Sequence, residues 1–197
     1  MVCQSELCPE GMSAIGHNRG PALTGGKGWQ VHCWRKARAD LLPQLPLEVI
    51  RLRVRRAKEI GLDYTSYATV RATTGHDIVA FLYSTNALHL FRADQALAAD
   101  RAAKLAAQSG VQRQLAAQPP LDPAATLAGL AAQGLRFDGS GRAPGLLTFP
   151  ALRDAVRGLL GGVPSDRVLL VGDTAVEREW CAAGRLAGYM PAERFFA

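Results

Sequence analysis

Cysteine and long apolar runs are both scarce in this chain of 197 residues. The four cysteines form no Cys-x-x-Cys pair, so neither a disulfide framework nor a zinc site of paired cysteines is expected. No apolar run approaches the length that spans a bilayer, and the N-terminus lacks the basic-then-apolar pattern of a signal peptide. These absences predict a cytoplasmic protein that has no membrane partner.

The chain does contain enough apolar material for a core. Hydrophobic residues make up 48% of the sequence and charged residues 20%, which is typical of a globular chain. The length suits one domain, with or without a small appendage. The formal net charge of +6 permits anionic partners but does not require them.

Glycine density and charge divide the chain into three parts. Residues 1–28 are rich in glycine and show no sustained periodicity, which predicts a flexible leader. Met12-Ser13-Ala14 reads like a start of translation, so residues 1–11 are interpreted as an extension that need not belong to the native protein. Residues 29–75 form a basic helical segment, and residues 76–197 form an α/β domain.

The basic segment contains two predicted helices. Between residues 47 and 58, apolar residues fall at helical spacing and basic residues lie opposite them. The same residues also alternate as in a strand, but the length of the segment and the following Gly61 favour a helix. Asp63 or Thr65 then caps a second helix, which reaches about Thr73 and ends at Gly75.

These two helices resemble a helix-turn-helix in outline. Their basic side chains either form a solvated face or bind the phosphates of a nucleic acid. In the second case the contacting residues are Arg51, Arg55, Arg56 and Lys58.

The clearest signal in the α/β domain is the stretch 167–177. Val168 to Val171 form an apolar run that is typical of a short strand buried on both faces. Gly172 ends the run, and Thr174 with Glu177 has the spacing of a capping box at the start of a helix. A buried strand followed at once by a capped helix places polar side chains at the carboxyl edge of an α/β sheet, where ligands bind.

Residues 77–83 form a second buried strand, which ends in Ser84-Thr85-Asn86. These small polar residues can cap a helix that begins near Ala87. Further helices are expected in the alanine-rich segment 94–118, with a break near 109–110, and in segments 122–134, 148–161 and 175–182. Residues 135–146 are expected to form a glycine-rich loop. The pattern predicts a small, mainly parallel sheet flanked by helices and preceded by the basic helical segment.

Three segments of the α/β domain are similar to motifs of the haloacid dehalogenase-like (HAD-like) hydrolases. The segment from Phe81 to Asn86 resembles the second motif of that family, an apolar strand that ends in Ser or Thr. The segment from Val168 to Glu177 resembles the fourth motif, in which Gly-Asp follows a strand and another acid lies four residues beyond the Asp. Arg142-Ala-Pro144 resembles the Lys-x-Pro segment, with Arg in place of Lys.

The resemblance implies a doubly wound α/β sheet and, in active members, a magnesium ion and phosphoester substrates. It implies that Ser84 or Thr85 and Arg142 contact phosphate, and that Asp173 and Glu177 contact Mg²⁺. Hard carboxylates suit magnesium, and a hydroxyl with a guanidinium suits a phosphoryl group. Ser84 and Asp173 should then lie at the same edge of one parallel sheet.

The chain departs from the family at the first motif. That motif, a strand ending in Asp-x-Asp, supplies the aspartyl nucleophile and is expected before Ser84. The nearest candidate, Asp63-Tyr64-Thr65, lacks the second Asp and follows a helical pattern. We therefore expect a non-catalytic or degenerate HAD-like domain that binds a small anion, such as a phosphate-bearing molecule, or a protein partner. The alternatives are a magnesium-dependent phosphoesterase and a nucleic-acid-associated protein that uses residues 35–58.

Overall fold

The computed structural model describes residues 32–33, 36, 45–92 and 95–197. The leader expected over residues 1–28, with its extension over 1–11, lies outside the described residues. A compact unit extends from Leu45 to Ala197, and it contains both the basic helices and the sheet.

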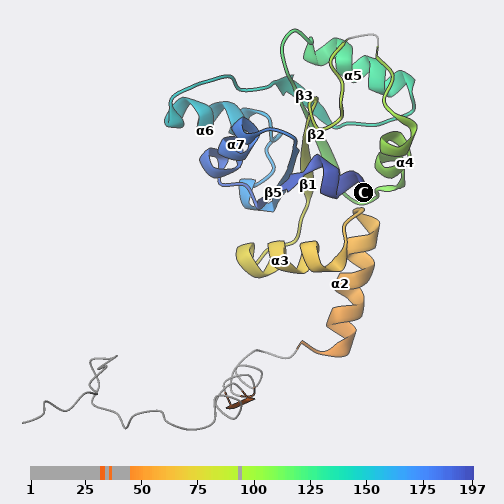
Figure 1. Ribbon diagram of the computed structural model, residues 1–197, viewed down its shortest axis with the longest axis vertical. Helices are drawn as coiled ribbons and strands as arrows, with labels where there is room; N and C mark the ends of the chain where they lie inside the picture. The colour runs from red at the N-terminus through yellow and green to blue at the C-terminus, as the bar shows by residue number, and fades with distance from the viewer. Residues whose placement is uncertain (1–31, 34–35, 37–44, 93–94) are drawn as a thin grey trace, which may run out of the picture. The chain divides into compact units, whose positions relative to one another are not determined.

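The unit is built on a five-stranded sheet in which every pair of neighbouring strands is parallel (Figure 1). The strand order is β3-β2-β1-β4-β5, so the first strand in sequence is central in the sheet. This confirms the predicted small parallel sheet flanked by helices. The strands are β1 (Ala80–Ser84), β2 (Gln112–Ala117), β3 (Gly139–Arg142), β4 (Val168–Gly172) and β5 (Gly188–Pro191).

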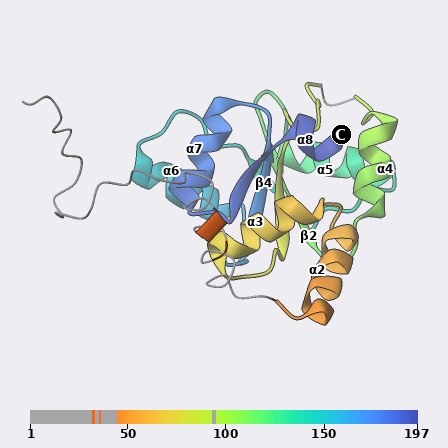
Figure 2. The ribbon, with the colours of Figure 1, turned by 60° about the horizontal axis from the view of Figure 1, so that its bottom comes forward.

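Helices cover both faces of the sheet, as Figures 1 and 2 show. Side chains alternate along β1, so that Leu82 packs with Val156 and Trp180 on one face while Phe81 packs with Phe195 on the other. Helices α6 (Phe149–Gly158) and α7 (Ala175–Gly184) cover the first face. The second core includes residues of α2 (Leu47–Glu59), α3 (Tyr64–Thr74), α4 (Ala99–Ala107), α5 (Pro123–Ala132) and α8 (Ala192–Phe196).

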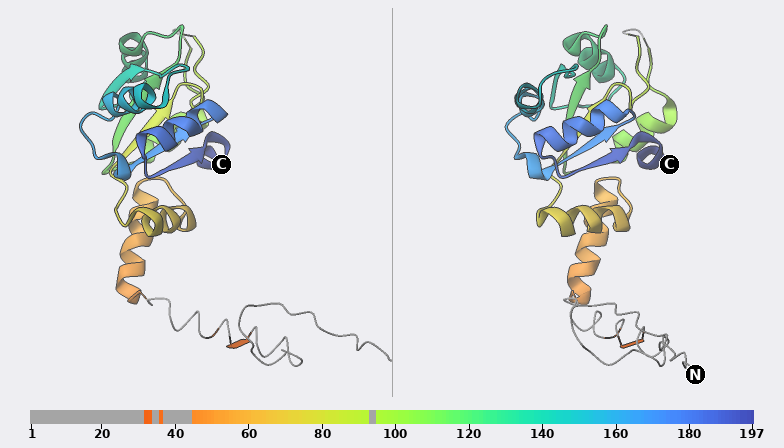
Figure 3. Two further views of the ribbon diagram at one scale, coloured as in Figure 1. Left: turned by 90° about the vertical axis from the view of Figure 1, so that its left-hand side faces the viewer. Right: turned by 60° about the vertical axis from the view of Figure 1, so that its left-hand side comes forward.

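From residue 45 onward, where the structure describes it continuously, the basic segment forms the two expected helices. Helices α2 and α3 lie beside the amino ends of the strands (Figure 3). Asp63 caps α3 by accepting a hydrogen bond from the backbone N–H of Ser66 at 2.9 Å. The first-motif candidate Asp63-Tyr64-Thr65 therefore lies at a helix start and not at the end of a strand.

The second half of the alanine-rich segment is a strand, where a helix was expected. Strand β2 forms hydrogen-bonded ladders with β1 on one side and with β3 on the other. This pairing buries Leu115, Ala116 and Ala117, so tertiary contacts override the helix propensity of alanine. Only the first half of the segment forms the expected helix, α4.

The glycine-rich segment 135–146, expected to be a loop, contains the edge strand β3. A Cβ atom on Gly139 would lie 2.4 Å from Gln114 Oε1, and one on Gly141 would lie 2.4 Å from Leu159 Cδ2. A side chain at either position would therefore displace the end of Gln114 or Leu159, so glycine allows these two side chains to pack closely on the strand. A strand of this composition has no side-chain pattern from which it could be predicted.

The segment after β1 forms a compact turn, where a helix was expected near Ala87. The backbone N–H of Leu88 donates to Ser84 O at 3.2 Å, and that of Leu90 donates to Thr85 O at 2.8 Å. His89 has a φ of +56°, which is incompatible with continuing a right-handed helix. The next helix, α4, begins at Ala99. No helix among the described residues is long and apolar enough to cross a bilayer.

Arg56 attaches α2 to the amino edge of the sheet. Its guanidinium donates to Asp77 Oδ2 at 3.1 Å and to the backbone carbonyls of Ile78 at 3.1 Å and Gly110 at 3.0 Å. Asp77 also accepts from the Tyr67 hydroxyl at 2.7 Å, which ties α3 to the same point. One arginine thus connects the helical segment to the chain just before β1 and β2.

Replacing Arg56 with alanine should lower the free energy of unfolding by about 2 kcal/mol, because three charge-assisted hydrogen bonds are lost together. Urea denaturation would measure this loss. Arg55→Ala, at an exposed position on the same helix, is the matched control and should change the stability by less than about 0.5 kcal/mol. Equal losses in the two variants would contradict the structural role of Arg56.

Candidate functional site at the carboxyl edge of the sheet

The two strand ends that carry the predicted site residues lie side by side. In the β1–β4 ladder Tyr83 pairs with Val171, so both strands reach the carboxyl edge at the same level. Ser84 and Asp173 therefore project from neighbouring parallel strands, as the family resemblance required. The end of β2, at Gln118, flanks β1 on its other side.

Ser84 and Thr85 are completely buried and hold the backbone of this edge together. Ser84 Oγ accepts a hydrogen bond from the backbone N–H of Ala87 at 3.0 Å. Thr85 Oγ1 accepts one from the backbone N–H of Gln118 at 3.0 Å. Both hydroxyls thus fix the turn after β1 and its junction with β2.

Glu177 lies at the centre of the carboxyl edge. Its side chain is fully buried at the start of α7. Oε2 accepts the backbone N–H groups of Asp173 at 2.6 Å and Thr174 at 2.9 Å. Thr174 Oγ1 in turn accepts the N–H of Glu177 at 3.4 Å, so the predicted capping box is confirmed.

The second oxygen of Glu177 faces two carboxamides. Oε1 accepts from Asn86 Nδ2 at 3.1 Å and from Gln118 Nε2 at 3.5 Å. The carboxylate therefore has four N–H donors, which matches the number of lone pairs that it offers. A cation approaching Oε1 would meet the partial positive charge of two amide groups. Among the described residues there is no cluster of three or more His, Cys, Asp or Glu side chains that could hold a metal.

The approach of Glu177 to the strand depends on Gly172. A Cβ atom on Gly172 would lie 2.8 Å from Glu177 Oε2 and 2.7 Å from Tyr189 Cε2. Tyr189 donates its hydroxyl to Thr174 O at 3.4 Å, and burial raises the pKa of this phenol. The strand end, the capping box and β5 thus meet at a position where only glycine fits.

Asp173 belongs to a more exposed group at the rim. Its Oδ2 lies 3.7 Å from His89 Nε2, and that nitrogen lies 3.1 Å from Arg101 Nη2. Arg101 also donates to the backbone carbonyl of Ala87. The His89 ring stacks on Phe91 with 6.1 Å between ring centroids. At the rim, the acid Asp173 is thus followed by two basic side chains, first His89 and then Arg101.

Arg142 does not join this group. It lies at the end of the edge strand β3, where it pairs in register with Ala117, so β2 separates it from β1. Its side chain is exposed. The structure therefore brings Ser84, Thr85, Asp173 and Glu177 together and leaves Arg142 two strands from Ser84.

Three functional candidates, Gln118, His89 and Arg101, could not be identified from the sequence. Residues 112–117 read as a helix in the sequence, so the sequence gives no sign that Gln118 follows a strand. His89 and Arg101 carry no local motif, and they meet only because the turn after β1 points toward α4. Asn86 had a signal, since it directly follows the predicted strand and its two hydroxyl residues.

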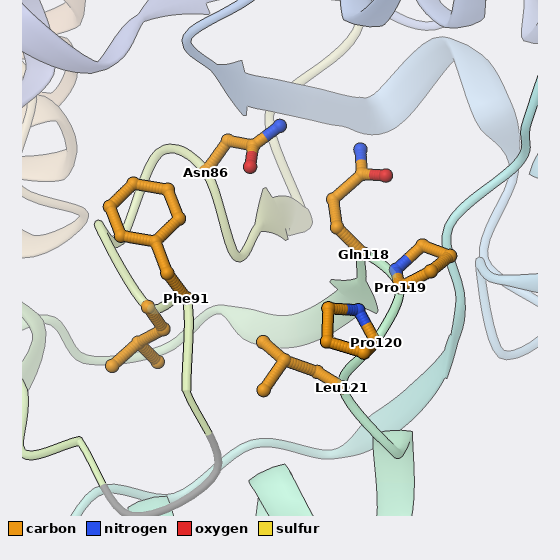
Figure 4. Close-up of a pocket in the computed structure, with 7 residues that line it drawn as sticks. Asn86, Phe91, Gln118, Pro119, Pro120 and Leu121 are labelled. Atoms are coloured by element: carbon orange, nitrogen blue, oxygen red, sulfur yellow. The ribbon is translucent and has the colours of Figure 1, made fainter.

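A pocket of about 140 Å³ opens beside the two amides (Figure 4). Its polar lining residues are Asn86 and Gln118. The remaining lining residues are apolar: Leu90, Phe91, Pro119, Pro120 and Leu121. The same carboxamides that donate to Glu177 therefore form part of the wall of a cavity.

The four basic residues proposed for nucleic acid binding differ in their contacts within the chain. Arg51 pairs with Glu48 at 2.7 Å, and Arg56 is committed to Asp77 and two backbone carbonyls. Arg55 and Lys58 are exposed on α2. Two of the four side chains thus have partners within the chain itself.

No family model, curated protein or solved structure matches the chain.

Replacing Glu177 with glutamine should lower the free energy of unfolding by about 3 kcal/mol. The amide of glutamine cannot accept from all four donors, so buried N–H groups lose their partner. Thermal and urea denaturation would measure the loss. Glu179→Gln, on the same helix but exposed, is the matched control and should be nearly neutral. A Glu177 variant as stable as this control would contradict the central role of the carboxylate.

Proposed function

We propose that the domain is a non-catalytic α/β module with the layout of a HAD-like hydrolase, and that it binds a ligand or a partner at the carboxyl edge of its sheet. The observation that carries the proposal is the complete hydrogen bonding of Glu177 by uncharged N–H donors. An acid with this environment has no remaining acceptor with which to hold Mg²⁺.

The position of β1 supports the same reading and changes the comparison with the family. The first motif of HAD-like hydrolases ends a central strand, and β1 is central in this sheet. Under the resemblance, Ser84-Thr85-Asn86 therefore corresponds to the first motif, Asp-x-Asp, and not to the second. Ser84 would stand where the nucleophilic Asp is expected, and Asn86 where the second Asp is expected.

These replacements remove the chemistry that a phosphoester hydrolase of that kind needs. The Ser84 hydroxyl is buried and already accepts a backbone N–H. Asn86 donates to Glu177, whereas an aspartate there would repel it unless a cation or proton lay between the two carboxylates. The edge is thus built to be stable without a metal.

A small anion at this edge would depend on the rim. Its basic side chains are His89, which lies next to Asp173, and Arg101, which lies next to His89. A protein partner would instead contact the exposed side chains around the same turn, of which Phe91 is the largest apolar one. Both occupants require the turn after β1, which is held in place by Ser84 and Thr85.

The decisive experiment measures magnesium dependence in two ways. The wild-type protein should hydrolyse p-nitrophenyl phosphate no faster with millimolar Mg²⁺ than without it, and Asp173→Asn should leave this background unchanged. Magnesium-dependent hydrolysis that Asp173→Asn abolishes would contradict the proposal and establish the phosphoesterase alternative.

A substitution at Asn86 should create the magnesium dependence that the wild-type protein is expected to lack. Asn86→Asp places a second carboxylate beside Glu177, so a divalent cation should stabilise the variant. Mg²⁺ should raise the Tm of Asn86→Asp by about 3 °C or more and leave that of the wild-type protein unchanged. A KCl solution of equal ionic strength is the control. An equal rise of the wild-type Tm in Mg²⁺ would contradict a metal-independent edge.

A further inference from the structure

The pocket beside the amides presents a single hydrogen-bond acceptor. An ionised carboxylate only accepts hydrogen bonds, so Asn86 must turn its amide nitrogen toward Glu177, to which it donates at 3.1 Å. Its carbonyl oxygen then faces the pocket, as Figure 4 shows, and no hydrogen bond among the described residues uses that oxygen. Gln118 donates to Glu177 at 3.5 Å, and its oxygen is turned away from the pocket (Figure 4). Glu177 thus fixes one acceptor, the Asn86 oxygen, in the wall.

The rest of the wall is apolar and includes three rings. The ring of Phe91 stacks on His89, and 58% of Phe91 remains exposed. Pro119 and Pro120 contribute two rigid rings on the opposite side of the pocket (Figure 4). Flat apolar surfaces favour planar ligands, because an aromatic ring gains contact over its whole face at little entropic cost.

The volume and the lining set the size and the charge of the ligand. An apolar cavity of about 150 Å³ can hold benzene, so a pocket of about 140 Å³ accommodates an aromatic ring. Phe91, Pro119 and Pro120 are exposed, so the pocket opens to solvent and a second, fused ring can extend through its mouth. None of the lining side chains carries a charge, which disfavours a charged ligand.

The Asn86 oxygen determines the polar group of the ligand. A ring that covers this oxygen removes it from water, and an acceptor left without a donor weakens binding, so the ligand must bring one donor. The ligand should bring no acceptor of its own, because the N–H groups that Asn86 and Gln118 donate are directed to Glu177. An indole meets both conditions, since its ring nitrogen donates one hydrogen bond and accepts none.

We propose that this pocket binds a neutral aromatic N–H heterocycle of the indole class. The ring would lie between Phe91 and the two prolines, and its N–H group would donate to the carbonyl oxygen of Asn86. The proposal rests on the proposed function, because Asn86 is held in this orientation only while Glu177 binds its amide and no metal. It adds the chemical class of the ligand that the carboxyl edge accepts.

The test compares indole with benzofuran, which has the same shape but an ether oxygen in place of the N–H group. Saturation-transfer NMR and calorimetry on the full chain should detect indole binding with a dissociation constant on the order of 1 mM, as expected for so small a ligand. Benzofuran should bind about fivefold more weakly or worse, because it places a second acceptor against the Asn86 oxygen and supplies no donor. Equal binding of the two compounds, or no binding of indole, would overturn the proposal.

The indole group belongs either to a free small molecule or to a tryptophan side chain of a protein partner, and N-acetyltryptophanamide separates these two sources. Tighter binding of this compound than of indole, through its added peptide groups, identifies a tryptophan side chain. Weaker binding identifies a free ligand. Either result supports the indole class when benzofuran binds more weakly than indole.

Two phenylalanine variants locate the binding. Phe91→Ala should weaken indole binding about fivefold or more through the lost ring contact. Phe149→Ala removes a similarly exposed ring that does not line the pocket and should leave indole binding unchanged. Equal effects of the two variants would overturn the assignment to this pocket.

The outcome is independent of the magnesium experiments. A wild-type protein that responds to neither Mg²⁺ nor indole would overturn the ligand class and leave the non-catalytic proposal standing. Magnesium-dependent hydrolysis would overturn the non-catalytic proposal, whether or not indole binds.

Discussion

The buried carboxylate of Glu177 is the interaction on which the carboxyl edge depends. A charge with no solvent exposure is costly unless it is fully hydrogen-bonded, and here the donors come from three separate parts of the chain. Two are backbone groups at the start of α7, one is the amide after β1 and one is the amide after β2. The strand ends are thereby tied to each other through a single side chain. No cation among the described residues contributes to this balance.

This arrangement explains why small residues surround the acid. Gly172 leaves room for the carboxylate, and the hydroxyls of Ser84 and Thr85 hold the turn that delivers Asn86. Each hydroxyl accepts a backbone N–H that has no partner in the sheet. The polar residues of this edge are therefore best understood as one hydrogen-bonded unit. Changing one of them alters the position of the others, so their effects on stability should not be additive.

Strands that consist of an unbroken run of apolar residues could be predicted from the sequence, because such a run is typical of a strand buried on both faces. Val168 to Val171 are apolar without a break, and the capping box that follows depends only on the spacing of Thr174 and Glu177. The hydrogen-bond partners of Glu177 could not be predicted in this way. Gln118 lies 59 residues away, and it follows a strand whose alanine-rich sequence predicts a helix. Sequence spacing indicated that Glu177 caps a helix. Only the strand order indicated which side chains complete its hydrogen bonding.

The strand order also affects how the proposed HAD-like layout applies to Ser84, Thr85 and Asn86. From the sequence, Ser84-Thr85-Asn86 matched a phosphate-binding motif, and the absence of an earlier Asp-x-Asp was a gap. Because β1 is central, the proposed HAD-like layout needs no earlier strand, and it would treat the gap as a replacement at the end of β1 itself. A carboxylate pair at this edge requires a cation or a proton between its members, whereas an amide beside a carboxylate requires neither. Under the HAD-like layout that we propose, Asn86 in place of the second Asp would give an edge that is complete without a metal, and its amide oxygen faces the neighbouring pocket (Figure 4).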